Sequence, residues 1–244
     1  HLSIRRQRQM CIRDRLIGFR ERASRYLADL SYCKVLHPSV GEKLPQLAAL
    51  ISSLACYRAV PQIEVAVGDN TTALVIRHLE ALSDKDKATI IEFAQQHGYS
   101  IYSQPGGLDS VVPLWPENPE LFYNLPAYQL RYDFLPTDFI QVNADINASI
   151  VDAVIAELAL EQNDTVLELF CGLGNFTLPI AKQVKQITAV EGDPGLVQRA
   201  RENAARNQIH NAGFHVANLM QDVSALPWIQ GRHYEPVSYT HLTL

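Results

Sequence analysis

The sequence predicts an α/β chain in which an α+β domain precedes an open, mainly parallel sheet with crossover helices. Three observations support this prediction. The first half alternates apolar and polar residues between turn signals, which is typical of antiparallel strands. The second half changes to short apolar runs separated by helical patterns, which is typical of a parallel sheet. A Gly-x-Gly turn at residues 172–174 follows the first of these runs, where doubly wound folds place their first strand-to-helix turn.

Composition narrows the class of protein. The 244 residues are 47% hydrophobic and 19% charged, as in an ordinary soluble globular protein. No run of about 18 apolar residues occurs, so no membrane span is expected. The first residues lack a signal-peptide pattern, so we expect a cytoplasmic protein. The net charge of −5 does not favour nucleic-acid binding, and four scattered cysteines without a C-x-x-C pair support neither a zinc site nor a disulfide framework.

Both ends of the chain differ in character from its body. Residues 1–15 contain five arginines and one acid without an apolar period, and residues 236–244 follow Glu235 with an abrupt change. We interpret both as a non-native leader and tail and exclude them from the fold prediction. Without the first fifteen residues, 16 basic and 25 acidic residues remain, a net charge of −9. The alternative is that residues 1–15 are a genuine basic arm, such as an RNA-binding tail.

The first domain, residues 16–137, is expected to combine helices with a largely antiparallel sheet. A hairpin is predicted where residues 68–71, Gly-Asp-Asn-Thr, join two alternating segments. Ser83 is expected to cap a helix that stops at Gly98. The elements expected up to residue 142 are a helix at 45–55, strands at 62–67 and 73–79, a helix from 83 to 97, a strand at 99–103, short strands within loops at 105–126, and extended segments at 128–134 and 139–142.

The second domain, residues 138–235, begins near Asp138, where the hydrophobic period changes. Right-handed crossovers turn alternating strands and helices into a parallel sheet. We therefore predict a Rossmann-like domain with a partial sheet, whose carboxyl edge carries the Gly-x-Gly turn. Its expected elements are a helix at 147–160, strands at 166–170, 186–191 and 213–217, and helices at 175–183 and 194–207 between the strands.

The residues around the Gly-x-Gly turn predict a site for a nucleoside-containing cofactor. Glu168 and Phe170, two positions apart in the expected strand, would share one face. Glu191 ends the next strand, where doubly wound folds place an acid that accepts hydrogen bonds from ribose hydroxyls. Thr177 stands where dinucleotide folds have a third glycine, so the pattern favours S-adenosylmethionine over NAD. The alternative is a glycine turn that binds nothing.

Four segments, taken in order, carry a resemblance to a known family. They are FIQVNADIN at 139–147, LELFCGLGNFTLPIA at 167–181, VEGDPGLVQRARENAARN at 190–207 and HVANL at 215–219. Together they resemble the RNA uracil-5 methyltransferases, and most of all the iron–sulfur members that modify 23S ribosomal RNA in bacteria. The resemblance spans residues 16–235 and is most specific in the second half. It implies S-adenosylmethionine-dependent methylation of uracil C5, with 23S ribosomal RNA as the partner.

The resemblance also implies a set of cofactor contacts. Gln141 would contact the cofactor, Phe170 and Asn175 would line its site, Glu191 would hold the ribose, and Asn218 would approach the adenine. Amide side chains suit such roles because they both donate and accept hydrogen bonds. The alternative for each amide is an ordinary capping or turn residue. With the two turn glycines, the candidate cofactor-binding residues are Gln141, Phe170, Gly172, Gly174, Asn175, Glu191 and Asn218.

The cysteines need separate interpretations. Cys33, in SYCKVLHP, resembles the segment that supplies the fourth ligand of the family's [4Fe–4S] cluster, whose other three cysteines form a close upstream group that this chain does not show. A cubane cluster needs four ligands, so we expect Cys33 to be a single remaining metal ligand and the chain not to hold a cluster. Cys56 is expected to be an ordinary buried thiol.

The family's chemistry adds a thiolate to C6 of uracil, and a base later removes the proton from C5. Both groups lie far downstream of the glycine turn in the family, so we expect neither in this chain and reject Cys171 as the nucleophile.

The missing fourth strand should leave the strand at 166–170 as an open edge prone to association. Two alternatives to the methyltransferase remain: a cofactor- or RNA-binding module without chemistry, and an NAD-dependent oxidoreductase.

Overall fold

The computed structural model describes residues 10–13, 16–19, 28–230, 234 and 237–239. The chain forms two compact units, and the second contains Phe122–Phe134 together with the residues from Asp138 onward. The sequence places this boundary near Asp138, whereas the structure assigns the preceding hairpin to the second unit. The physical reason is that Leu125, Leu130 and Tyr132 of the hairpin are buried in that unit's core.

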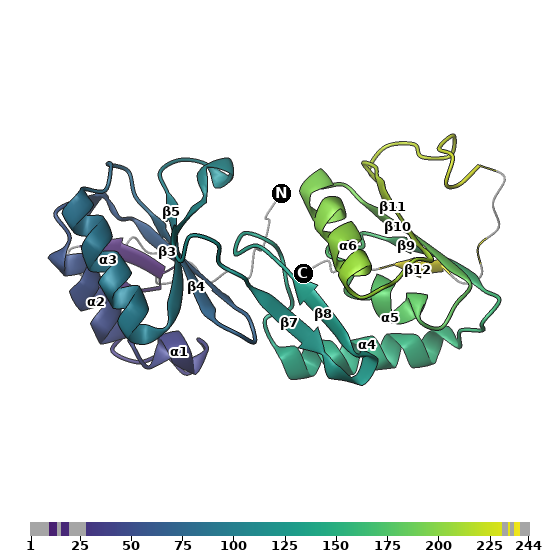
Figure 1. Ribbon diagram of the computed structural model, residues 1–244, viewed down its shortest axis with the longest axis horizontal. Helices are drawn as coiled ribbons and strands as arrows, with labels where there is room; N and C mark the ends of the chain where they lie inside the picture. Colours follow the sequence, from purple (N-terminus) through teal and green to yellow (C-terminus); the bar gives the residue numbers. More distant parts are fainter. Residues whose placement is uncertain (1–9, 14–15, 20–27, 231–233, 235–236, 240–244) are drawn as a thin grey trace. The chain divides into compact units, whose positions relative to one another are not determined.

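The first unit is built on a mixed six-stranded sheet with the order β2-β1-β3-β4-β5-β6. Figure 1 labels three of its strands, β3, β4 and β5. Only β4 and β5 run parallel, and the other neighbours are antiparallel, as the sequence predicts for most of this sheet. The strands are β1 (Met10–Arg13), β2 (Leu16–Gly18), β3 (Gln62–Val67), β4 (Thr72–Arg77), β5 (Tyr99–Gln104) and β6 (Val112–Trp115).

Strand β1 lies within the leader that the sequence excludes from the fold. Its Met10 and Cys11 are opposite Ile63 and Gln62 of β3 in antiparallel register. The structure therefore differs from the sequence-based expectation at this strand, because the backbone of the strongly basic segment can still pair with the edge of β3. Residues 1–9 and 14–15 of that leader lie outside the described residues.

Helices α1 (Pro38–Gly41), α2 (Leu44–Ser53) and α3 (Asp84–His97) belong to the first unit. The predicted ends of α3 are confirmed: Ser83 and Asp86 form a capping box, and Gly98 adopts a left-handed conformation with φ +71°. The unit's core joins the apolar faces of α2 and α3 to one face of the sheet; its fully buried members include Leu47, Ile51, Ile63, Leu74, Ile90 and Ile101.

The second unit contains a parallel four-stranded sheet with the order β11-β10-β9-β12 (Figure 1). The strand–helix alternation predicted from the sequence is confirmed for β9 to β11. The strands are β9 (Thr165–Leu169), β10 (Gln186–Glu191), β11 (Ala212–Val216) and β12 (Val237–Tyr239), and the helices are α4 (Ala144–Leu158), α5 (Thr177–Ala181) and α6 (Pro194–Arg206). Among the described helices, none is both long and apolar enough to cross a bilayer.

The edge of β9 differs from the sequence-based expectation. We expected this strand to be an open edge, yet β12 runs parallel to it, with Val237 opposite Leu167 and Tyr239 opposite Leu169. The expectation of an unpaired edge is therefore wrong for this structure, because the ladder to β12 uses the backbone groups on that edge of β9, and the association predicted from an open edge loses this basis. Strand β12 comes from the segment 236–244 that was set aside as a tail.

The two faces of this sheet contact different parts of the second unit. The register places Val166 of β9 beside Ile187 of β10, and these side chains share a core with α4, α5 and α6. On the opposite face, Leu167 and Val190 pack with Trp228 from the segment that follows β11. Because Glu168 shares the face of Val166, it points toward the helices.

A two-stranded hairpin completes the second unit. Strands β7 (Phe122–Leu125) and β8 (Leu130–Asp133) pair antiparallel, and Tyr123 lies opposite Tyr132. These two rings stack with centroids 4.8 Å apart and planes inclined by 8°. The segment 139–142, expected to be extended, contains no regular strand, and α4 begins earlier than expected because Asn143 caps it through the N–H of Ile146.

Candidate cofactor site

The turn after β9 has an unusual backbone. Phe170, Gly172 and Gly174 all have left-handed φ values, of +61°, +54° and +88°. For a residue with a Cβ this conformation costs about 1–2 kcal/mol, so Phe170 is strained while the glycines are not. A Cβ placed on Gly172 would meet nothing within 4 Å. The backbone at Gly172 therefore faces open space that a ligand could occupy.

Phe170 does not lie where the strand pattern predicts. Strand β9 ends at Leu169, and Phe170 is the first residue of the turn. Side chains alternate between the two faces only within the strand, so the prediction that Phe170 shares a face with Glu168 does not hold. Phe170 stays half-buried at the carboxyl end of β9, beside the glycine turn.

The carboxylate of Glu191 connects the turns that follow β9 and β10. One of its oxygens accepts a hydrogen bond from the Gly172 N–H at 3.1 Å. The other accepts from the N–H groups of Gly192 at 2.6 Å and Asp193 at 3.2 Å. A carboxylate has about four lone-pair sites, so Glu191 can accept a further donor. Its position at the carboxyl ends of two parallel strands is the one that the sequence predicts.

Glu168 is a site residue whose surroundings the sequence did not reveal. Its side chain is fully buried, and the Thr177 hydroxyl donates to one carboxylate oxygen at 2.5 Å. The other oxygen has no hydrogen-bond partner among the described residues. Burial raises the pKa of Glu168 to about 8, the Thr177 hydrogen bond opposes this rise, and the charge of Glu191 adds to it. The contact explains why Thr177, where dinucleotide folds have glycine, is useful here.

Asn175 is held by side chains rather than facing open space. It forms a reciprocal amide pair with Asn147 of α4, with donor–acceptor distances of 2.8 and 3.1 Å. The Tyr123 hydroxyl donates to the Asn175 side-chain oxygen at 3.0 Å, and the Tyr132 hydroxyl donates to its carbonyl at 3.3 Å. The sequence did not indicate the two tyrosines, because they lie 52 and 43 residues away along the chain.

The two remaining candidate amides occupy different settings. Asn218 is exposed just beyond β11, and its side-chain oxygen accepts from the Met220 N–H at 3.0 Å. The Ala217 N–H, one residue earlier, donates to the carbonyl of Glu191 at 3.0 Å, so Asn218 lies at the same sheet edge as Glu191. Gln141 is half-buried before α4, and no described residue hydrogen-bonds to its side chain.

The cysteines do not form a metal or nucleophilic site in the described part of the chain. Cys171 is buried, and burial followed by the charges of Glu168 and Glu191 raises its pKa. A thiolate is therefore strongly disfavoured there. Cys33 is half-buried, and the described residues contain no group of three potential metal ligands, so they do not fit a cluster on their own.

Comparisons with known proteins agree with this geometry. A family model described as tRNA (Uracil-5-)-methyltransferase matches residues 120–223. The 23S rRNA (uracil(1939)-C(5))-methyltransferase RlmD of Xanthomonas euvesicatoria is 50% identical over 215 residues, which are 88% of this chain and 48% of that protein. The RlmD of Vesicomyosocius okutanii is 46% identical over 90% of this chain and 50% of its own length. The chain thus spans about half the length of the curated relatives it matches.

A solved structure shares the fold. The Pyrococcus abyssi tRNA (uracil-54, C5)-methyltransferase in complex with S-adenosyl-L-homocysteine aligns with a TM-score of 0.66 and 17% identity, over 88% of this chain and 55% of the other. The mixed α/β architecture with a methyltransferase sheet is therefore established. Over most of its length the chain is about half identical to such methyltransferases, and the family model matches the segment that contains the glycine turn, so the chain is similar to the RNA uracil-5 methyltransferases.

Proposed function

We propose that this chain carries the S-adenosylmethionine site of an enzyme that methylates C5 of uracil in 23S ribosomal RNA, and that it works in the cytoplasm. The observation that carries the proposal is the backbone of Gly172, which faces open space and whose N–H donates a hydrogen bond to the Glu191 carboxylate. The relatives named for this reaction support the choice of substrate. When bound, S-adenosylmethionine supplies a methyl group on a positively charged sulfur.

The charges around the turn suit a cationic ligand. The charge of Glu191 disfavours the ionised form of Glu168, and Glu168 has one oxygen without a partner among the described residues. A positive charge nearby would favour the ionised form of Glu168. A dinucleotide brings two phosphate charges instead, and these would repel the same pair. The carboxylates therefore favour the sulfonium cofactor over NAD.

Several residues would orient the cofactor. Glu191 would accept hydrogen bonds from the ribose hydroxyls, and the Gly172 turn would allow the ligand to approach without a Cβ between them. Asn218, at the same sheet edge, would lie toward the adenine, and Phe170 would form a wall of the site. Gln141 would offer an amide from the segment before α4.

The step on uracil requires a thiolate at C6, and Cys171 is a poor source of it. Its thiol is buried, and its pKa is raised by burial and by two carboxylates. We therefore assign it no catalytic part. Cys33 remains a candidate for a single iron ligand, and a cluster would need three more ligands.

Isothermal titration of the chain with S-adenosylhomocysteine and, separately, NAD tests the cofactor assignment. We expect binding of the first and none of the second. The variant Glu191→Ala should lower the affinity at least about tenfold, the effect of losing charge-assisted hydrogen bonds worth about 1.5–3 kcal/mol. Glu202→Ala is the matched control, because Glu202 is an exposed acid on α6. Equal binding of NAD, or unchanged affinity in Glu191→Ala, would contradict the proposal.

The substrate assignment needs its own measurement. Filter binding in the presence of S-adenosylhomocysteine should show tighter association with a 23S ribosomal RNA fragment than with transfer RNA of equal length. Binding is the measurement to use, because the thiolate and the base of the transfer step are not expected in this chain. Tighter association with the transfer RNA would overturn the assignment.

A further inference from the structure

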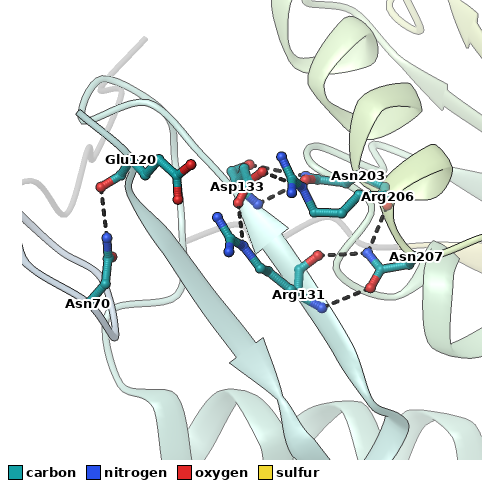
Figure 2. Close-up of polar contacts among 7 residues, drawn as sticks. All are labelled: Asn70, Glu120, Arg131, Asp133, Asn203, Arg206 and Asn207. Carbon is teal, nitrogen blue, oxygen red and sulfur yellow. Dashed lines mark hydrogen bonds and ion pairs between the residues drawn. The ribbon is translucent and has the colours of Figure 1, made fainter. Parts of the chain in front are cut away.

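Helix α6 carries a polar stripe that binds the hairpin of the same unit. Arg199 and Asn203 of α6, and Asn207, the residue that caps its C-terminus, are spaced by four residues and so lie on one side of the helix. Asn207 accepts from the Arg131 N–H at 2.9 Å and donates to the Arg131 carbonyl at 2.7 Å. Asn203 does the same with Asp133, at 2.8 and 3.1 Å (Figure 2).

The two asparagine amides hydrogen-bond to backbone groups of β8, as a neighbouring strand would. Arg131 and Asp133 are two positions apart in β8, so their backbone groups point to the same edge, opposite β7. Two strand residues advance by about 6.7 Å and four helical residues by about 6 Å, so the spacing of the amides matches that of the strand. Each asparagine can therefore satisfy one N–H and one C=O, and together they fix both the position and the register of β8.

Charged contacts at the same place contribute less. Asp133 pairs with Arg206 at 2.6 Å and with Arg131 at 2.8 Å, and all three side chains are about a third to a half exposed. Exposed ion pairs contribute about 0–1 kcal/mol. Asn203 is buried, and removing it would leave the N–H of Asp133 without this partner, at a cost of about 1–3 kcal/mol. The amide contacts therefore contribute more than the ion pairs to the attachment of the hairpin.

The hairpin also contacts Asn175, the residue that follows the Gly-x-Gly turn at 172–174. Tyr123 and Tyr132 stack on each other, and both hydroxyls donate to Asn175, one to the side chain and one to the backbone. Asn147 binds the same side chain from α4. The amide of Asn175 is thus oriented by two elements, and the adjoining Gly174 carries the left-handed φ that shapes the turn.

We propose that Asn203, Asn207, Tyr123 and Tyr132 are positioning residues for cofactor binding: α6 fixes the hairpin, and the hairpin tyrosines fix Asn175 and the turn beside it. None of the four touches the cofactor in this proposal. A second contact of the stripe acts on the same site, because Arg199 binds Asp138 at 2.5 Å, three residues before Gln141. The proposal rests on the cofactor assignment made above.

Tyr123→Phe is the sharpest test, since it removes one hydroxyl and keeps the stacked ring. We expect its affinity for S-adenosylhomocysteine to fall about three- to tenfold, as for the loss of one hydrogen bond. Tyr128→Phe is the matched control, because that hydroxyl donates to Asp152 at 2.8 Å and has no contact with Asn175. Unchanged affinity in Tyr123→Phe, or an equal loss in Tyr128→Phe, would overturn the proposal.

The link through α6 is tested by Asn207→Ala, with Gln198→Ala as its control, since the exposed Gln198 side chain donates a hydrogen bond to Glu202 of the same helix. Asn207→Ala should lower the affinity for S-adenosylhomocysteine. In the double variant with Tyr123→Phe, the fold-loss of affinity should be smaller than the product of the two single fold-losses, because both substitutions act through Asn175. Full multiplication of the effects would show two independent contributions and refute the shared route.

Hydrogen–deuterium exchange of the cofactor-free chain separates this proposal from the cofactor assignment. Peptides covering residues 170–176 should exchange faster in Tyr123→Phe and Asn207→Ala than in their controls, whichever cofactor binds. Faster exchange without any binding of S-adenosylhomocysteine by the unaltered chain would refute the cofactor assignment alone. Unchanged exchange, with binding intact, would refute the positioning role alone.

Discussion

Glu168 shows how burial alters a single side chain. An unfolded chain would release its proton near the ordinary value of 4.5, whereas the folded chain holds it until the pKa of about 8. Between these values the folded state binds more protons than the unfolded state, so the contribution of Glu168 to stability is greatest at low pH and is lost as the pH rises toward 8. An ionised Glu168 is thus favoured only when a positive group lies nearby.

Replacing Glu168 with glutamine should therefore change the pH dependence of stability. The amide keeps the size of the protonated acid and cannot ionise, so Glu168→Gln should remove a slope of at most about 1.4 kcal/mol per pH unit between pH 5 and 8. Urea denaturation at several pH values measures the difference from the unaltered chain. Glu161→Gln, at an exposed acid, serves as the control. Parallel slopes for all three proteins would contradict the prediction.

At the scale of elements, alanine substitutions at two glycines distinguish the effect of backbone strain from the effect of blocking a ligand. Gly172 in the cofactor turn and Gly98 after α3 both have left-handed φ, and a Cβ on either would meet nothing within 4 Å. Gly172→Ala and Gly98→Ala should each cost about 1 kcal/mol of stability. Only Gly172→Ala should also weaken S-adenosylhomocysteine binding, because its methyl group occupies the open space. Titration with S-adenosylhomocysteine and thermal unfolding of both variants test this prediction. Equal affinities of the two variants would contradict it.

Local signals account for the elements that the sequence predicted well. Ser83 and Gly98 mark the ends of α3 through capping and a left-handed turn, both of which depend on adjacent residues alone. The start of α4 was missed because Asn143 was interpreted as part of a motif rather than as a cap. The hairpin strands were expected, but their attachment was not, since the partners of Arg131 and Asp133 lie 76 and 70 residues away.

The candidate site divides in the same way. Glu191 and the glycines were predictable because strand ends and φ restrictions have sequence signatures. The orientation of Asn175 was not, since it depends on the stacked tyrosines and on α4. The edge of β9 was also mispredicted: its pairing with β12 depends on a long-range ladder that no local pattern indicates.

At the scale of the whole molecule, the two units have separate cores, and the hairpin of Phe122–Phe134 belongs to the second. Leu178→Ala in the second core and Ile90→Ala in the first should each cost about 2–5 kcal/mol, since both side chains are fully buried. Hydrogen exchange of β8 should rise in Leu178→Ala and stay unchanged in Ile90→Ala. Greater exchange of β8 in the Ile90 variant would place the hairpin with the first core.

The reciprocal amide pair of Asn147 and Asn175 has a consequence for how such a protein can diverge over time. Each side-chain amide donates one hydrogen bond to the other and accepts one from it. A substitution at either position therefore leaves the remaining amide without this partner. Tolerated drift would have to alter both positions in concert. In sequences that descend from this chain, we expect substitutions at the two positions to occur together, although the positions lie 28 residues apart.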